Sequence, residues 1–134
     1  MRRIAIILSV VLFSLFAIPI NAKDKTLPLH ELKMPPGFAI HIYADVPHAR
    51  SLALGADGVV FVGTRKTGKV YALIPNKNGT HAKKVILIAD SMTMPNGVAY
   101  RNGNLYVAEM TRIWKYPDIE KHLNGWCLIF VDGI

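Results

Sequence analysis

The sequence repeats itself once in its middle part, and this repeat constrains the fold more than any single motif does. The second copy follows the first at offsets of 46, 45 and 43 residues. A pattern that recurs after about 45 residues indicates two copies of one structural unit. The aligned stretches are residues 49–54 (ARSLAL) with 95–100 (PNGVAY), 57–63 (DGVVFVG) with 102–108 (NGNLYVA), and 69–73 (KVYAL) with 112–116 (RIWKY).

Each copy has the pattern of short β-strands separated by turns. The pairs Asp57-Gly58 and Asn102-Gly103 tolerate the positive φ of a two-residue hairpin. The strands that follow these pairs are apolar at nearly every position, which predicts that both of their faces are covered. The expected strands are 51–55, 59–64, 69–74 and 83–89 in the first copy, and 97–100, 104–109, 112–116 and 126–131 in the second.

Four antiparallel strands within about 45 residues, covered on both faces, are typical of a β-propeller blade. We therefore predict an all-β protein, a β-propeller fragment with two four-stranded blades over about 49–90 and 95–134. Residues 37–46 are predicted as an additional N-terminal strand that latches a ring. Only residues 117–123 have a helical pattern, with Asp118 as the expected N-cap.

Two blades are too few to close a propeller ring. A propeller closes with four or more blades, and the sequence accounts for two. Two blades alone would leave apolar faces and strand edges open. We therefore expect missing blades or self-association to complete the ring, and we favour the interpretation that the sequence is part of a longer propeller.

Residues 1–22 are predicted as a secretory signal peptide. Arg2 and Arg3 precede an apolar run, and the small residue Ala22 marks the expected cleavage site. Pro19 interrupts the run before a helix could span a bilayer, although an uncleaved anchor is the alternative. This predicts a periplasmic or secreted domain over residues 23–134, with no stable membrane span after cleavage.

The charge and the cysteine content exclude several classes of function. Without Arg2 and Arg3 the chain has 14 basic and 9 acidic residues, a net charge of +5. The cations are scattered, and no aromatic residues interleave with the densest pair, Lys83-Lys84, so nucleic acid is not an expected partner. A single cysteine, Cys127, excludes an internal disulfide.

Residues 63–69 (GTRKTGK) match the first part of the phosphate-binding pattern G-x-x-x-x-G-K. A working loop of this kind needs Ser or Thr after the lysine and then a helix whose N-terminus faces the phosphates. Val70 occupies the Ser/Thr position and begins a β-like stretch. We therefore predict a hairpin loop, not a nucleotide site.

Seven short motifs follow one another in a specific order: LKMPPGF (32–38), HARSLAL (48–54), DGVVFVGTR (57–65), GKVY (68–71), PNGVA (95–99), LYVAE (105–109) and RIWKY (112–116). In this order and spacing they resemble the N-terminal part of the glucose/sorbosone dehydrogenase family. The likeness covers roughly residues 27–123. Single motifs such as PNGVA recur in many propellers, lactonases included, so the order and the spacing make the match specific.

The resemblance implies a six-bladed propeller that binds pyrroloquinoline quinone (PQQ) and calcium at the mouth of its channel and oxidises sugars. In such quinoproteins a histidine takes a proton from the substrate while hydride passes to the quinone. That histidine belongs to a His-Gly-Trp segment of a later blade, and the nearest stretch here, 124–126, is Asn-Gly-Trp. We therefore assign no catalytic residue and expect the chain alone to be inactive.

Arg50 and Asn96 are the candidate cofactor-binding residues. They occupy equivalent repeat positions in the loops that enter the first strand of each blade, where propellers bind ligands. An arginine could pair with a quinone carboxylate, and an asparagine could bond its ring or a sugar hydroxyl. The alternative is that each side chain satisfies backbone groups of its own loop. His48 is a third candidate.

Glu109 could serve as a metal or sugar ligand, but we expect a salt bridge to Arg112 instead, and no metal ligand is assigned. Trp114 and Tyr71 match each other in the repeat, which favours packing between blades. Two alternative functions stay open. One is a metal-dependent lactonase-like propeller, in which Asn96 and Glu109 would matter more than Arg50, and the other is a non-catalytic binding propeller.

Overall fold

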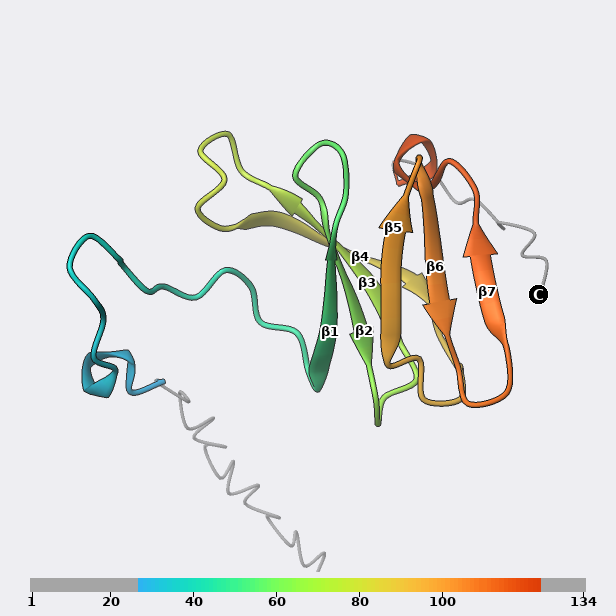
Figure 1. Cartoon of the computed structure of the whole chain (residues 1–134), viewed down its shortest axis with the longest axis horizontal. Coiled ribbons are helices and arrows are strands. Elements are labelled where there is room, and N and C mark those ends of the chain that lie inside the picture. Colours follow the sequence, from blue (N-terminus) through green and yellow to red (C-terminus); the bar gives the residue numbers. More distant parts are fainter. Residues whose placement is uncertain (1–26, 124–134) are drawn as a thin grey trace, which may run out of the picture.

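The computed structural model describes residues 27–123, which form two antiparallel β-sheets (Figure 1). The first sheet has the strand order β1-β2-β3-β4, and the second has the order β5-β6-β7. In this part of the chain the elements are η1 (Leu29–Glu31), β1 (Ala49–Leu54), β2 (Val60–Thr64), β3 (Val70–Pro75), β4 (Ala82–Ala89), β5 (Gly97–Arg101), β6 (Asn104–Ala108), β7 (Ile113–Tyr116) and η2 (Ile119–His122), where η is a 3-10 helix.

The strands lie where the repeat predicts them, within two residues at each end, and the all-β class is confirmed. The predicted strand over residues 126–131 and the predicted signal peptide lie outside the described residues. No helix within residues 27–123 is long and apolar enough to cross a membrane.

The strand predicted over residues 37–46 is wrong, because the structure forms none there. Within the described residues, this segment is tied to the first sheet by a backbone hydrogen bond from the Ala82 amide to the Tyr43 carbonyl, at 2.8 Å. A strand needs a neighbour along its whole length to satisfy its amides and carbonyls. Without that neighbour, Phe38 and Ile42 stay exposed at 70% and 51%.

The two predicted hairpin turns differ from each other. Asn102 and Gly103 both have positive φ, 49° and 81°, and Arg101 pairs with Asn104, so β5 and β6 are joined by a two-residue turn as predicted. The turn between β1 and β2 is longer, because Leu54 pairs with Val60. It is closed by a 2.7 Å hydrogen bond from the Gly55 amide to the Val59 carbonyl, with positive φ at Gly58.

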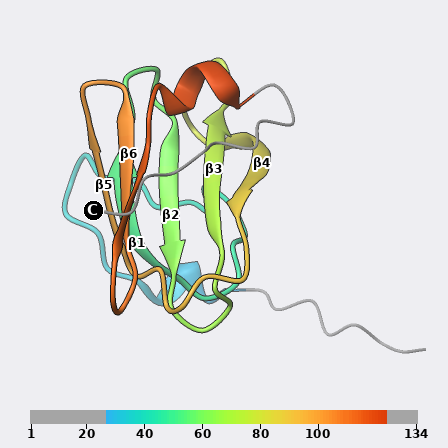
Figure 2. The same cartoon turned by 90° about the vertical axis from the view of Figure 1, so that its right-hand side faces the viewer.

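The two sheets share one apolar core, in which side chains from β2 and β3 pack with side chains from β6 and β7. Phe61, Val70, Leu105 and Val107 are fully buried there. The sheets approach each other along β1 and β5, and β2 also meets β5. Figure 1 shows the second sheet broadside, whereas Figure 2 shows β2 and β3 broadside, so one sheet is turned relative to the other.

The prediction that the inner strands are covered on both faces holds for β2 but only in part for β6. Phe61 and Val62 point to opposite faces of β2, and both are buried. In β6, Leu105 and Val107 are buried on the core side, while Tyr106 and Ala108 on the other side are half-buried.

The helix η2 covers the end of the core where β1 turns into β2. Ile119 and Leu123 are buried, and the predicted helical segment is confirmed in the form of a 3-10 helix. Glu120 accepts hydrogen bonds from the Tyr100 hydroxyl at 2.5 Å and from the Asp57 amide at 3.4 Å. The Tyr100 ring in turn stacks on Phe61, with centroids 5.6 Å apart. These contacts join η2, β5 and the first sheet.

The N-cap predicted at Asp118 is in the correct position, but its side chain does not cap the helix. Asp118 has a left-handed backbone, with φ 45°, and its carboxylate pairs with Lys121 at 3.0 Å. A capping residue needs an extended backbone to direct its side chain at the free amides. The left-handed conformation therefore leaves the carboxylate to the neighbouring lysine.

Raising the pH above about 10 is expected to destabilise the fold in part through Tyr100. The hydrogen bond to Glu120 raises the pKa of Tyr100 above the ordinary value of 10.0, and burial raises the pKa of Tyr116. A phenol with a raised folded-state pKa adds stability that is complete below the unfolded-state pKa and is lost as the pH rises through the folded-state pKa. Urea unfolding between neutral and strongly alkaline pH should show this loss, and Tyr100→Phe should reduce it.

Tyr106→Phe is the matched control for this measurement, because Tyr106 lies on the outer side of the second sheet. The same reduction in Tyr106→Phe, or an unchanged alkaline profile in Tyr100→Phe, would contradict the role given to the Tyr100–Glu120 bond.

Candidate functional site

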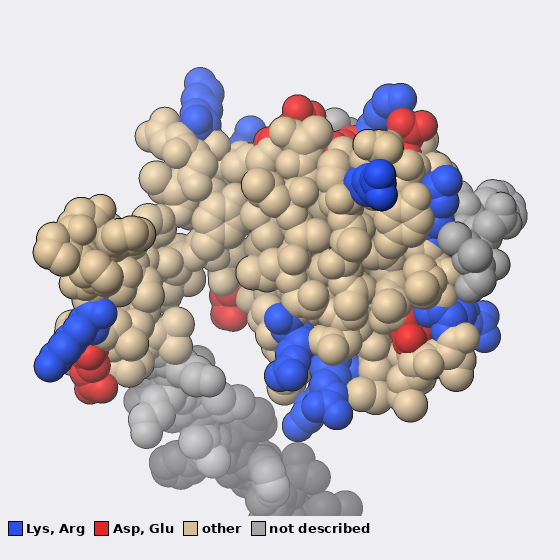
Figure 3. All heavy atoms as spheres, in the orientation of Figure 1, with Lys and Arg blue, Asp and Glu red and all other residues tan. Residues whose placement is uncertain are grey.

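The candidate site residues lie at one end of the two sheets, which we call the hairpin end. It comprises residues 48–50 before and at the start of β1, the β2–β3 hairpin (64–69), the connection between the sheets (91–96) and the β6–β7 hairpin (109–112). Figure 1 shows these hairpins at the lower ends of the strands, and Figure 3, in the same orientation, shows a group of Lys and Arg side chains at the lower end of the sheets.

The connection 91–96 holds the two hairpins together through its backbone. The Met92 amide donates to the Gly68 carbonyl at 3.0 Å, and the Met110 amide donates to the Thr93 carbonyl at 3.4 Å. A side chain at Gly63 or Gly68 would collide with backbone oxygens, those of Pro95 and Met92 respectively. The glycines of the β2–β3 hairpin therefore serve a close approach of two backbones.

Thr64 organises the β2–β3 hairpin from within. Its buried hydroxyl accepts hydrogen bonds from the Lys69 amide (2.9 Å) and the Thr67 hydroxyl (2.7 Å), and it donates to the Lys69 carbonyl (2.7 Å). The strand β3 begins at Val70, directly after Lys69, where a phosphate-binding loop would begin a helix. The prediction of a hairpin is therefore confirmed. Lys69 pairs with Asp90 at 3.5 Å.

Glu109 stands at the repeat position of Thr64 and joins the β6–β7 hairpin to the connection. Its carboxylate accepts hydrogen bonds from the Thr93 amide and from the indole Nε1 of Trp114, the latter at 2.6 Å. It also lies 3.8 Å from the Arg112 guanidinium, which confirms the predicted salt bridge. The side chain is only 8% exposed. Both carboxylate oxygens are thus used in holding the hairpin end together.

Arg50 and Asn96 both lie beside the end of β2. Arg50 is at an irregularity in β1 between Ala49, which pairs with Thr64, and Ser51, which pairs with Gly63. The Asn96 carbonyl lies 3.1 Å from the position that a Cβ of Gly63 would take. The structure therefore brings the two predicted residues to the same part of the hairpin end.

The side chains of Arg50 and Asn96 are exposed, and neither has a bonding partner among residues 27–123. The structure therefore does not show the alternative arrangement, in which each side chain would hydrogen-bond backbone groups of its own loop. His48, with φ 58°, is exposed as well.

The described residues contain no cluster of acidic, His or Cys side chains of the kind that holds a metal ion. Calcium takes six to eight oxygen ligands, so a calcium ion here would need ligands from elsewhere. The guanidinium of Arg50 and the amide of Asn96 are exposed, and both groups can bond carboxylate and carbonyl oxygens.

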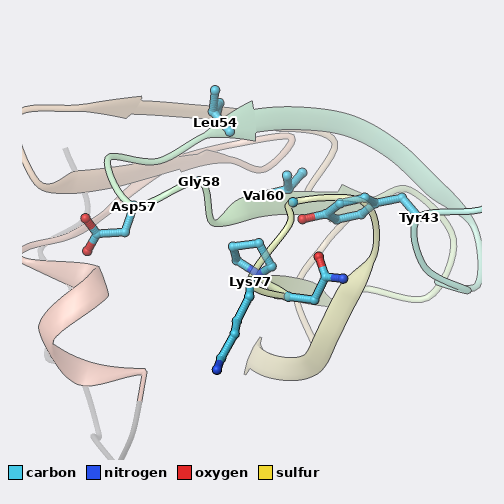
Figure 4. Close-up of a pocket in the computed structure, with 9 residues that line it drawn as sticks. Tyr43, Leu54, Asp57, Gly58, Val60 and Lys77 are labelled. Carbon is cyan, nitrogen blue, oxygen red and sulfur yellow. The ribbon is translucent and has the colours of Figure 1, made fainter.

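An open hollow of about 440 Å³ lies at the opposite end of the first sheet. Tyr43, Leu54 and Val60 form its apolar side, and Asp57 and Lys77 lie on its polar side (Figure 4). No motif of the sequence indicates this hollow. It depends on the contact of the segment around Tyr43 with the sheet, which no local pattern encodes.

Comparisons with known proteins leave the family of the chain open. No protein-family model matches it, and no solved structure matches it. A protein of Borreliella burgdorferi, described only as "Uncharacterized protein", is 26% identical over 115 residues, which is 84% of this chain and 28% of that protein. The chain thus spans about 28% of the length of the curated relative that it matches.

Replacing Glu109 by alanine is expected to lower the free energy of unfolding by about 1–3 kcal/mol, because the Thr93 amide and the Trp114 indole would lose their acceptor. Arg112→Ala is the matched control and should cost less than about 1 kcal/mol, because this ion pair is half-exposed on the arginine side. Urea unfolding followed by tryptophan fluorescence measures both. Equal and small losses would show that the carboxylate does not hold the hairpin end.

Proposed function

We propose that the chain supplies two neighbouring blades of a β-propeller belonging to a PQQ-dependent sugar or aldose dehydrogenase of the sorbosone type, in the periplasm or outside the cell. The observation that supports it best is the correspondence between the sequence repeat and the two sheets. Each repeat forms one antiparallel sheet, and the first strands of the two sheets, β1 and β5, lie beside each other.

The connectivity favours blades over the halves of a β-sandwich. Among residues 27–123 each sheet is built from consecutive strands, and no strand there crosses from one sheet to the other. A sandwich of the Greek-key type exchanges strands between its two sheets. In a propeller, a short connection leads from the outermost strand of one blade to the innermost strand of the next. Residues 90–96 between β4 and β5 have this role here.

The ligand would bind at the hairpin end, because the segments that lead into β1 and β5 meet there. Arg50 and Asn96 are the residues that we propose for binding the cofactor, with the guanidinium on a quinone carboxylate and the amide on a ring or sugar oxygen. The quinone, when bound, would supply the redox chemistry. Calcium ligands and the proton-accepting histidine would come from outside residues 27–123, so the described residues alone provide binding and orientation.

The structure of the hairpin end favours this proposal over the lactonase alternative. That alternative gives Glu109 a larger role than Arg50, but the Glu109 carboxylate is already bonded to Thr93, Trp114 and Arg112. The Borreliella burgdorferi protein extends well beyond the matched stretch, which covers 28% of it, and a closed propeller needs more blades than the two described here.

Titration of the chain with PQQ, followed by quenching of tryptophan fluorescence, tests the proposal. We expect weak but saturable binding, and Arg50→Ala should raise the Kd about 10- to 100-fold, the range of a hydrogen bond to a charged group. Asn96→Ala should raise it by a smaller factor, because its contact is uncharged.

Arg101→Ala is the matched control, since Arg101 is also exposed but lies at the other end of β5. If PQQ does not bind saturably, or if Arg101→Ala weakens binding as much as Arg50→Ala, the proposed cofactor contact is wrong.

A further inference from the structure

Each sheet has one face in the shared core and one face that the other sheet does not cover. We call the uncovered face of the first sheet face A. The pairing register places its residues side by side across the strands. Leu52 and Leu54 on β1 are 64% and 69% exposed, and Val85 and Leu87 on β4 are 44% and 48% exposed. The members of face A are Leu52, Leu54, Val60, Val62, Tyr71, Leu73, Val85 and Leu87.

The repeat assigns a role to face A. Six of its members align with the side chains by which the second sheet packs against the first. The aligned pairs are Leu52 with Val98, Leu54 with Tyr100, Val60 with Leu105, Val62 with Val107, Tyr71 with Trp114, and Leu73 with Tyr116. Face A thus repeats a surface that is built to pack against another sheet of this kind.

The uncovered face of the second sheet, which we call face B, repeats the complementary surface. The pairing register places Ala99, Tyr106 and Lys115 in one row, and Gly97, Ala108 and Ile113 in the next. These residues align with Ala53, Phe61, Ala72, Ser51, Gly63 and Val70. These aligned residues lie on the face of the first sheet that packs against the second sheet or against the connection 91–96.

One position on face B departs from the repeat, since Lys115 stands where the first sheet has Ala72. Lys115 is half-buried. A lysine can lay its methylene chain along an apolar surface and keep its ammonium group in water at the rim. Lys115 therefore allows face B to be exposed to water and also to pack against an apolar partner.

We propose that face A of one molecule docks on face B of a second copy of this chain, in a head-to-tail contact. The contact continues, between molecules, the packing that already joins the two sheets within one molecule. The two surfaces differ, so the contact is heterologous, and each copy keeps one free face A or face B for a further copy. This proposal rests on the repeat and on the packing of the sheets, and it is independent of the proposed dehydrogenase function.

The segment around Tyr43 lies beside part of face A and must be accommodated in the contact. It shares the hollow with Leu54 and Val60, and one backbone hydrogen bond in the described residues holds it to β4. Val62 and Leu73 are already buried, at 1% and 4% exposure. The docking partner therefore meets mainly the exposed side chains of β1 and β4 and can displace a weakly held segment.

Sedimentation velocity and light scattering of the purified chain at concentrations up to about 0.1 mM test the proposal, because a contact of modest affinity is populated there. The face A variant is Leu52→Glu with Leu54→Glu, and the face B variant is Ala99→Glu with Ile113→Glu. All four positions are exposed in the single molecule, so each variant should keep its fold, which circular dichroism checks.

We expect the unaltered chain to form species larger than a monomer, and each variant alone to be a monomer. An equimolar mixture of the two variants should form a one-to-one heterodimer and nothing larger, because one intact face A and one intact face B remain. The control variant, Asn78→Glu with Met110→Glu, changes two exposed positions outside both faces and should associate like the unaltered chain.

Three outcomes would overturn the proposal. A monomeric unaltered chain would mean that other sheets, such as those of a longer polypeptide, cover the two faces. Association of the face B variant alone into a dimer would indicate a symmetric contact of face A with face A. Association that persists in both variants would place the contact in another part of the chain.

Discussion

The burial of both faces of β2 is the constraint on which the rest of the structure depends. Phe61 and Val62 are neighbours that point to opposite sides, and both are buried. One packed neighbour can cover only one face of a sheet. The second sheet covers the side of Phe61, and the Tyr100 ring stacks there. Within residues 27–123 no second sheet covers the side of Val62, although apolar residues on both faces are typical of a sheet that is packed on both sides.

The geometry between the sheets follows from backbone contacts at the hairpin end. Gly63 and Gly68 let the connection 91–96 approach the β2–β3 hairpin more closely than any side chain would permit. Thr64 and Glu109, at the same repeat position, then act differently: the threonine closes its own hairpin, and the glutamate reaches across to the connection. Glu109 thus holds the β6–β7 hairpin to the connection, whereas the β2–β3 hairpin is held to it by the backbone hydrogen bond from Met92 to Gly68.

The sequence was sufficient for the strands, because hydrophobic periodicity and turn residues are local signals and the repeat supplied each of them twice. It was not sufficient for contacts between distant residues. Glu120 bonds Tyr100 and Asp57, which lie 20 and 63 residues away, and no local pattern indicates these partners. The predicted strand over 37–46 failed for a related reason. Its apolar residues alternate as they do in a strand. A strand also needs a neighbouring strand to hydrogen-bond with, and the sequence pattern does not indicate whether one is present.

Some repeat positions carry side chains that pack or bond within the fold, and others carry side chains that make no such contact in the described residues. Tyr71 and Trp114 are both aromatic and share a repeat position: Trp114 packs against the shared core, and Tyr71 lies on face A of the first sheet. Arg50 and Asn96 do not keep a common character, and their side chains have no bonding partner within the described residues. Thr64 and Glu109 hold the hairpins without a hydrogen bond to either of these side chains. A charged or polar side chain that the fold does not use, on a backbone that the fold holds firmly, is suited to binding a polar ligand.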